Sequence, residues 1–349
     1  MEVPDLWRNR RSRRFRLLIF VVLAMAACAA VPPTIAQSCT TQAEMDAATR
    51  NGLEQSALAT AQQIAATAGN AAGNAALQAS IAPQVEQDAA GILNSIASAA
   101  PLVKGASFLV ENLYVLDATK APANGLSDTP TQFYCGSMNE PPHVIFTLAH
   151  LPQARYAVAM VHATGIAKPQ QMTIIFAQSQ GSWKLAGFAY RPLAMAGHDG
   201  VWYWKQARVY AQQKQNWDAY LYYKTAQILV TPVDFVSSSN LNKLMREEDA
   251  VKPAGLPGQQ PMELVNSAQK FSITSLHTDS YQGGLDLVIH YQTNSVQDPV
   301  ATRQQNLAVM HLMLQAHPEL RQAFHGLWVY ADAPGQDPFG IELPMSQIP

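Results

Sequence analysis

Apolar residues in the first part of the chain follow a helical spacing. Between residues 41 and 100 they recur every three to four positions, and 20 of the 60 residues are alanine, a strong helix former. We expect two or three helices in the region 37–104. Because alanine buries little surface, these helices need a close partner, such as the rest of the chain or a second copy; the alternative is a partly ordered arm. The apolar stripe comprises Leu53, Ala57, Ile64, Val85, Ile92 and Ile96.

The pattern then changes to that of an α+β domain over residues 105–195. Phe108, Leu109, Leu113 and Leu116 predict a helix over 106–120, and the Pro-, Gly- and Ser-rich segment 121–142 predicts a loop. Short runs rich in β-branched and aromatic residues follow, and such runs predict an antiparallel sheet. The predicted strands are 144–148, 156–162, 172–177 and 183–190.

The last 150 residues predict helices and then a second sheet. An aromatic helical hairpin is expected within 198–250, with Asp199 capping its first helix, and the Pro/Gly-rich segment 251–263 predicts a linker. Residues 264–349 predict a ββαββ domain whose first hairpin turns at Gly283-Gly284. That turn would place His277 directly opposite His290.

Three resemblances follow from these patterns. Segment 202–232 resembles a single tetratricopeptide (TPR) repeat, through Ala207, Tyr210, Ala219, Tyr223 and Ala226, with Trp217 near the turn. One unit does not imply the groove of a solenoid, which needs about three repeats. Segment 144–190, through its last hairpin closing on Gly181-Ser182-Trp183-Lys184-Leu185, resembles cystatin-like and NTF2-like sheets. The whole chain resembles secreted bacterial proteins without an assigned activity.

The N-terminus has the composition of a secretory signal peptide. Six arginines within the first 16 residues precede a 15-residue apolar run, Leu17–Val31, and then Thr34-Ile35-Ala36. The run is shorter than the 18 or so residues of a membrane span. We expect cleavage after Ala36, with no membrane span afterwards, and a periplasmic or secreted protein. The alternatives are a lipoprotein anchored through Cys28, after Met25-Ala26-Ala27, and an uncleaved anchor.

Removing residues 1–36 changes the charge and the cysteine count. The remainder has 17 basic and 23 acidic residues and no basic run, which argues against nucleic-acid binding. Two cysteines remain, Cys39 and Cys135, and in an oxidising compartment an even pair predicts a disulfide. The alternative is two free thiols.

Candidate sites come from three groups of side chains. Two imidazoles and a carboxylate on one sheet face, His277, His290 and Asp279, would suit zinc or copper; the alternative is an ordinary polar sheet face. Exposed aromatics suit partner proteins or sugars. The candidate partner-binding residues are Trp202, Trp204, Trp217 and Tyr220, and the candidate ligand-pocket residues are Phe146, Tyr156 and Trp183, with Met160, Phe176 and Phe188 in the same predicted lining.

Familiar catalytic signatures are missing from the sequence. It contains no G-x-S-x-G, no phosphate-binding glycine loop, no H-E-x-x-H and no C-x-x-C, so we name no catalytic residue and no cofactor. The sequence favours a non-enzymatic envelope protein that binds or scaffolds another envelope protein and self-associates through its N-terminal helices. A cystatin-like or NTF2-like pocket that binds a ligand or catalyses a reaction, and a metal-binding C-terminal domain, are the alternatives.

Overall fold

The computed structural model describes residues 38–68, 71–121, 130–136, 143–265 and 269–349. The predicted signal peptide 1–36 and the alternative lipidation residue Cys28 lie outside these described residues. Within them the chain has the predicted α+β class, with helices and mostly antiparallel strands.

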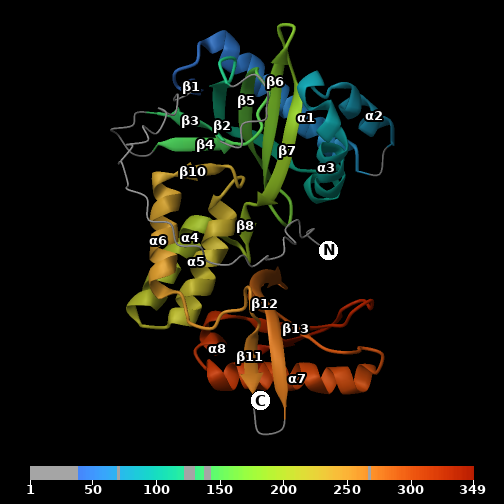
Figure 1. Cartoon of the computed structure of the whole chain (residues 1–349), viewed down its shortest axis with the longest axis vertical. Coiled ribbons are helices and arrows are strands. Elements are labelled where there is room, and N and C mark those ends of the chain that lie inside the picture. Colours follow the sequence, from blue (N-terminus) through green and yellow to red (C-terminus); the bar gives the residue numbers. More distant parts are fainter. Residues whose placement is uncertain (1–37, 69–70, 122–129, 137–142, 266–268) are drawn as a thin grey trace, which may run out of the picture. The chain divides into compact units, whose positions relative to one another are not determined.

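A five-stranded antiparallel sheet organises the N-terminal half (Figure 1). Its central strand β5 is buried on both faces from Tyr156 to Val161, so both faces of the sheet need a cover. The strands, in spatial order, are β1 (Ser38–Thr41), β2 (Ser107–Asp117), β5 (Arg155–Thr164), β6 (Gln170–Ser179) and β7 (Ser182–Pro192).

The alanine-rich helices cover one face of this sheet. Leu53, Ile64 and Ile96 of the predicted stripe are fully buried, in a core that includes residues of β2, β5 and β6. Ala57 and Ala61 are also fully buried, and their small side chains let α1 approach the sheet closely. The described helices of the region 37–104 therefore form a packed layer. Its elements are α1 (Ala47–Ala66), α2 (Ala71–Ala79), the 3-10 helix η1 (Pro83–Asp88) and α3 (Ala89–Val103).

The prediction of a helix over 106–120 is wrong, because this segment is strand β2. It pairs with β1 on one side and with β5 on the other. A bulge between Val110 and Asn112 shifts the alternation, so that Phe108, Val110, Leu113 and Val115 all face the alanine-rich helices. Because the inward-facing positions change from even to odd numbers at the bulge, the apolar residues of this strand have a spacing similar to that of a helix.

The opposite face of the sheet is covered partly by a small three-stranded sheet, in the order β10-β4-β3. Strand β3 (Thr131–Cys135) lies within the predicted loop 121–142, which corrects that prediction; β4 (Val144–Leu148) pairs with β3 and with β10 (Val236–Ser238). The predicted disulfide is present and joins Cys39 of β1 to Cys135 of β3. On the disputed chain-entropy model, its 96-residue separation is worth up to about 4–5 kcal/mol.

Three helices follow the first sheet. The predicted hairpin consists of α4 (Gly200–Gln212) and α5 (Asn216–Val230). Asp199 caps α4 as expected, since its Oδ1 accepts a hydrogen bond from the backbone N–H of Trp202 at 2.7 Å. A third helix, α6 (Ser239–Val251), packs against α5 and was not predicted.

The C-terminal region has the predicted ββαββ order with one added edge strand. That strand, β11, begins inside the predicted linker 251–263. Strand β14 pairs in parallel with β13 because helix α7 crosses between them. In spatial order the sheet comprises β11 (Met262–Val265), β12 (Lys270–Tyr281), β13 (Gly284–Gln292), β14 (Gly326–Asp332) and β15 (Phe339–Pro344); α7 (Pro299–Ala316) and α8 (Leu320–Ala323) precede β14.

One hydrophobic core joins the helices α4 and α5 to the C-terminal sheet. It includes Tyr203 and Tyr222 from the helices and Leu287 and Val329 from the sheet. The Tyr222 hydroxyl donates a hydrogen bond to the backbone oxygen of Ala323 at 2.6 Å. Helices α4 and α5 thus share buried surface with residues beyond 251–263.

A buried carboxyl lies at the start of α5. Asp218 is fully buried, and neither carboxyl oxygen has a hydrogen-bond partner among the described residues. Burial, with a smaller contribution from the charge of Glu319, raises the pKa of Asp218 to about 7. The folded protein therefore holds this proton at pH values where an unfolded chain has released it.

We expect Asp218 to lower stability as pH rises. Because its pKa is raised in the folded state, the free energy of unfolding should fall between about pH 4 and pH 7, by up to about 4 kcal/mol. Asp218→Asn should remove this fall and stabilise the protein at pH 8 more than at pH 4, as measured by urea unfolding at several pH values. The exposed Asp249→Asn is the control, and parallel pH profiles of wild type and Asp218→Asn would contradict the expectation.

Candidate functional site

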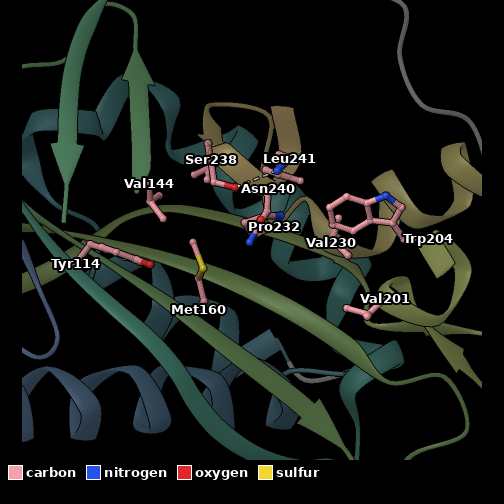
Figure 2. A pocket seen from close by; sticks show the side chains of 11 residues that line it. Tyr114, Val144, Met160, Val201, Trp204, Val230, Pro232, Ser238, Asn240 and Leu241 are labelled. Atoms are coloured by element: carbon pink, nitrogen blue, oxygen red, sulfur yellow. Dashed lines mark hydrogen bonds between the residues drawn. The ribbon is translucent and has the colours of Figure 1, made fainter. Parts of the chain in front are cut away.

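An apolar groove of about 290 Å³ lies between the first sheet and the helices α4 and α6. Figure 2 shows Met160 pointing from the sheet toward Pro232 and Asn240, while Val201 and Trp204 extend from α4. The groove lies on the face of the sheet that the three-stranded sheet covers. Its lining residues are Tyr114, Val144, Met160, Val201, Trp204, Val230, Pro232, Val236, Ser238, Asn240 and Leu241.

The segment after α5 shapes one wall of the groove. Pro232 has no backbone N–H, and α5 ends two residues earlier, at Val230. Just before β10, the backbone oxygen of Phe235 accepts a hydrogen bond from the N–H of Thr147 at 2.8 Å. Ser238 follows and caps α6, since its hydroxyl accepts a hydrogen bond from the N–H of Leu241 at 3.2 Å. The same residue thus lines the groove and starts the helix.

The Trp204 wall is held by a charged clamp between α4 and α6. Glu247 accepts hydrogen bonds from Trp204 Nε1 at 2.8 Å and from Arg208 Nε and Nη2 at 2.7 and 2.9 Å. The Arg208 guanidinium also lies 4.6 Å from the centre of the Trp204 ring. Desolvation raises the pKa of Glu247, but the hydrogen bonds from Arg208 and Trp204 outweigh it, so the pKa lies below its usual value. Trp204 is fixed before any ligand arrives.

The described lining of the groove is uncharged. No Asp, Glu, His, Lys or Arg lines it, and burial raises the pKa of Tyr114, which keeps its hydroxyl neutral at pH 7. General acid–base catalysis requires a group that exchanges protons near the working pH, and this lining offers none. The surface is suited to receiving an apolar group.

Apolar exposure continues outward from the groove. Val201 at its rim is 49% exposed, and Val209, two turns further along α4, is 40% exposed. On α6, Met245 is 46% exposed and lies one turn beyond the lining residue Leu241. Exposed apolar side chains on two neighbouring helices are typical of protein contact surfaces.

The structure separates the four predicted partner-binding aromatics. Trp204 lines the groove, whereas the exposed Trp202 stacks on His198, with ring centres 3.6 Å apart. Trp217 is buried against the His317 ring at 4.1 Å, and Tyr220 is half-buried beside Lys224. Of the four, the groove includes Trp204 alone.

The predicted ligand-pocket residues do not converge either. Phe146 and Tyr156 are buried between the two sheets, and the Tyr156 hydroxyl donates to the backbone oxygen of Pro152 at 2.8 Å. Trp183 packs with the alanine-rich helices, on the other face of the five-stranded sheet. Met160, from the same predicted lining, is the residue that reaches the observed groove.

The predicted register of the C-terminal hairpin is wrong by two residues. His277 pairs with Val288, and His290 pairs with Ser275. The two-residue turn is Gln282-Gly283, with positive φ at both positions, as a type I′ turn requires. Gly284 is therefore part of the strand, where a Cβ would lie 2.4 Å from the His325 side chain.

In this register His277, His290 and Asp279 do not converge on one point as the predicted metal ligands would. The rings of His277 and His290 stack with centres 5.8 Å apart, and His290 Nδ1 lies 3.0 Å from Asp332 Oδ2. Among the described residues, a different group brings three potential ligand atoms within 4.8 Å of one another: Asp286, His325 and Glu342. The His277, His290 and Asp279 site remains a prediction that this geometry does not favour.

Sequence reasoning missed two sets of residues. Helix α6 supplies Asn240, Leu241 and Glu247, and its signal was the capping serine Ser238 before apolar residues at helical spacing. The group of Asp286, His325 and Glu342 is spread over 57 residues of sequence. Its only local signal was the nearby glycines Gly284 and Gly326.

Comparisons with family models, curated proteins and solved structures found no match to this chain. Within the described residues, none of the helices has both the length and the apolar character needed to span a membrane.

We expect Glu247→Gln to weaken the clamp that holds Trp204. Both charged partners are partly exposed, so the loss should be modest, about 1–2 kcal/mol of unfolding free energy. A double-mutant cycle with Arg208→Gln, followed by urea unfolding, should give a coupling energy near 1 kcal/mol. Glu86→Gln, an exposed change on η1, is the control, and additive effects of the two clamp variants would disprove the coupling.

Proposed function

We propose that this chain is an exported binding protein of the cell envelope whose groove receives an apolar side chain of a partner protein. The observation that carries this proposal is the groove itself, which is apolar, uncharged and bordered by exposed apolar residues on α4 and α6. Binding without catalysis fits a lining that offers no group able to exchange a proton at pH 7.

The size of the groove favours a side chain over a free ligand. Its volume of about 290 Å³ lies just below the range of roughly 300–1,000 Å³ for small-molecule sites. A partner that inserts one or two apolar side chains would also cover Val201, Val209 and Met245, which a small ligand would leave exposed. Protein interfaces combine such a central anchor with a surrounding apolar and polar rim.

Export rests on the N-terminal sequence and on the disulfide. Disulfides persist outside the reducing cytosol, and the Cys39–Cys135 bond joins two different sheets. Segment 202–232 resembles a TPR repeat, and segment 144–190 resembles a cystatin-like or NTF2-like sheet. In this proposal both segments serve as scaffolds for the groove, and the activities of those families are not part of it.

The groove is tested by a charged substitution at its rim. Val201→Arg should reduce capture of the partner from envelope fractions at least tenfold, because an arginine at the rim would lose its hydration when the partner binds. A photocrosslinking residue at position 201 should form a defined adduct that Met160→Trp, which fills the groove, abolishes. Val300→Arg, at an exposed valine of α7, is the matched control.

Two results would contradict the groove proposal. Equal capture by wild type, Val201→Arg and Val300→Arg would show that the partner binds elsewhere. A small apolar molecule that co-purifies in the groove, detected by native mass spectrometry and displaced by Met160→Trp, would identify a ligand-binding protein instead.

Export is tested by the N-terminus of the protein isolated from its own cells. We expect a chain that begins at Gln37, carries the oxidised disulfide and fractionates with the envelope. A lipid-modified chain beginning at Cys28 would support the lipoprotein alternative and keep the envelope location. Recovery of the intact chain from Met1 in the cytosol, with reduced cysteines, would overturn export.

A further inference from the structure

Three side chains from neighbouring strands meet on the outer face of the C-terminal sheet, opposite the side that α7 covers. Asp286 lies on β13, His325 directly precedes β14, and Glu342 lies on β15. One potential ligand atom of each lies within 4.8 Å of the other two. His325 Nδ1 is 2.9 Å from Asp286 Oδ1.

The two carboxylates of this group have unmet bonding capacity. Asp286 is fully buried, yet its Oδ2 has no hydrogen-bond partner, and the buried Oε1 of Glu342 has none either. Among the described residues, the one ion pair made by either carboxylate is that of Asp286 with His325. A buried carboxylate oxygen that lacks a hydrogen-bond partner is costly unless it holds a proton or binds a cation.

Two glycines keep the space around these side chains open. A Cβ at Gly326 would lie 2.8 Å from Glu342 Oε1 and 3.2 Å from Asp286 Oδ1. A Cβ at Gly284 would overlap the His325 side chain at 2.4 Å. Neither needs to be glycine for a turn, since Gly284 begins β13 and Gly326 begins β14. A side chain at Gly326 would therefore enter the site, and one at Gly284 would displace His325.

We propose that Asp286, His325 and Glu342 bind a divalent transition-metal ion, with zinc as the reference ion. One imidazole nitrogen and two carboxylate oxygens form a mixed donor set that zinc accepts, whereas calcium and magnesium take oxygen ligands. Tetrahedral ligands of zinc lie about 3.4 Å apart, so atoms within 4.8 Å of one another need to close by at most about 1.4 Å.

The site is accessible and would cross-link three strands. The His325 side chain is 38% exposed, which gives an ion a route to the buried Asp286. Three protein ligands leave a fourth position open for water or for a group from outside the chain. A bound ion would fix β13, the start of β14 and β15 relative to one another, which predicts higher stability in its presence.

The test is isothermal titration calorimetry of the chelator-treated full chain with ZnCl2, together with thermal unfolding measured with and without ZnCl2. We expect one bound ion per chain and a melting temperature raised by about 2–5 °C at saturation. Glu342→Gln and His325→Gln should each weaken binding at least tenfold and abolish the thermal shift. MgCl2 and CaCl2 should give neither effect.

Two control variants separate this site from its neighbours. Asp279→Asn changes an exposed carboxylate directly opposite Asp286, and His290→Gln removes an imidazole of the alternative metal set. Both should bind zinc as wild type does.

The proposal is overturned if wild type binds no zinc at about 100 µM ZnCl2. It is also overturned if His290→Gln abolishes binding while Glu342→Gln and His325→Gln retain it. Neither result depends on the groove.

Discussion

The central constraint in the N-terminal half is that strand β5 is apolar on both faces, so the five-stranded sheet needs a cover on each side. Alanine-rich helices pack closely on one face because small side chains allow a short distance between helix and sheet. On the other face, a short three-stranded sheet and the helices α4 and α6 share the covering. Their junction is imperfect, and the groove lies there.

The helices beside the groove have two neighbours. Tyr203 of α4 packs into the core shared with the C-terminal sheet, while Val201 and Trp204 of the same helix face the groove. Helix α6 holds Trp204 through Glu247, which also pairs with Arg208. The groove wall is therefore built from side chains whose positions are set by contacts outside the groove, and its shape depends on the packing of all three helices.

The sequence predicted most elements because their patterns were local. The stripe from Leu53 to Ile96, the strands 156–162, 172–177 and 183–190, the Asp199 cap and the disulfide pair could all be read from spacing or composition. The errors came from non-local effects. A bulge reversed the side-chain alternation of β2. Gly284 lies in a strand and not in the turn, and its lack of a Cβ leaves room for the His325 side chain. The groove residues come from seven helices and strands, and no local pattern links Tyr114 to Leu241.

The bond between Cys39 and Cys135 also determines how the protein responds to cleavage. It closes a covalent ring that contains the alanine-rich helices and strand β2. A protease that cuts once between these two cysteines opens the ring without releasing a fragment, since both pieces stay attached through sulfur. Such a nicked molecule keeps its mass apart from one added water, and it separates into two polypeptides only when a reductant is present.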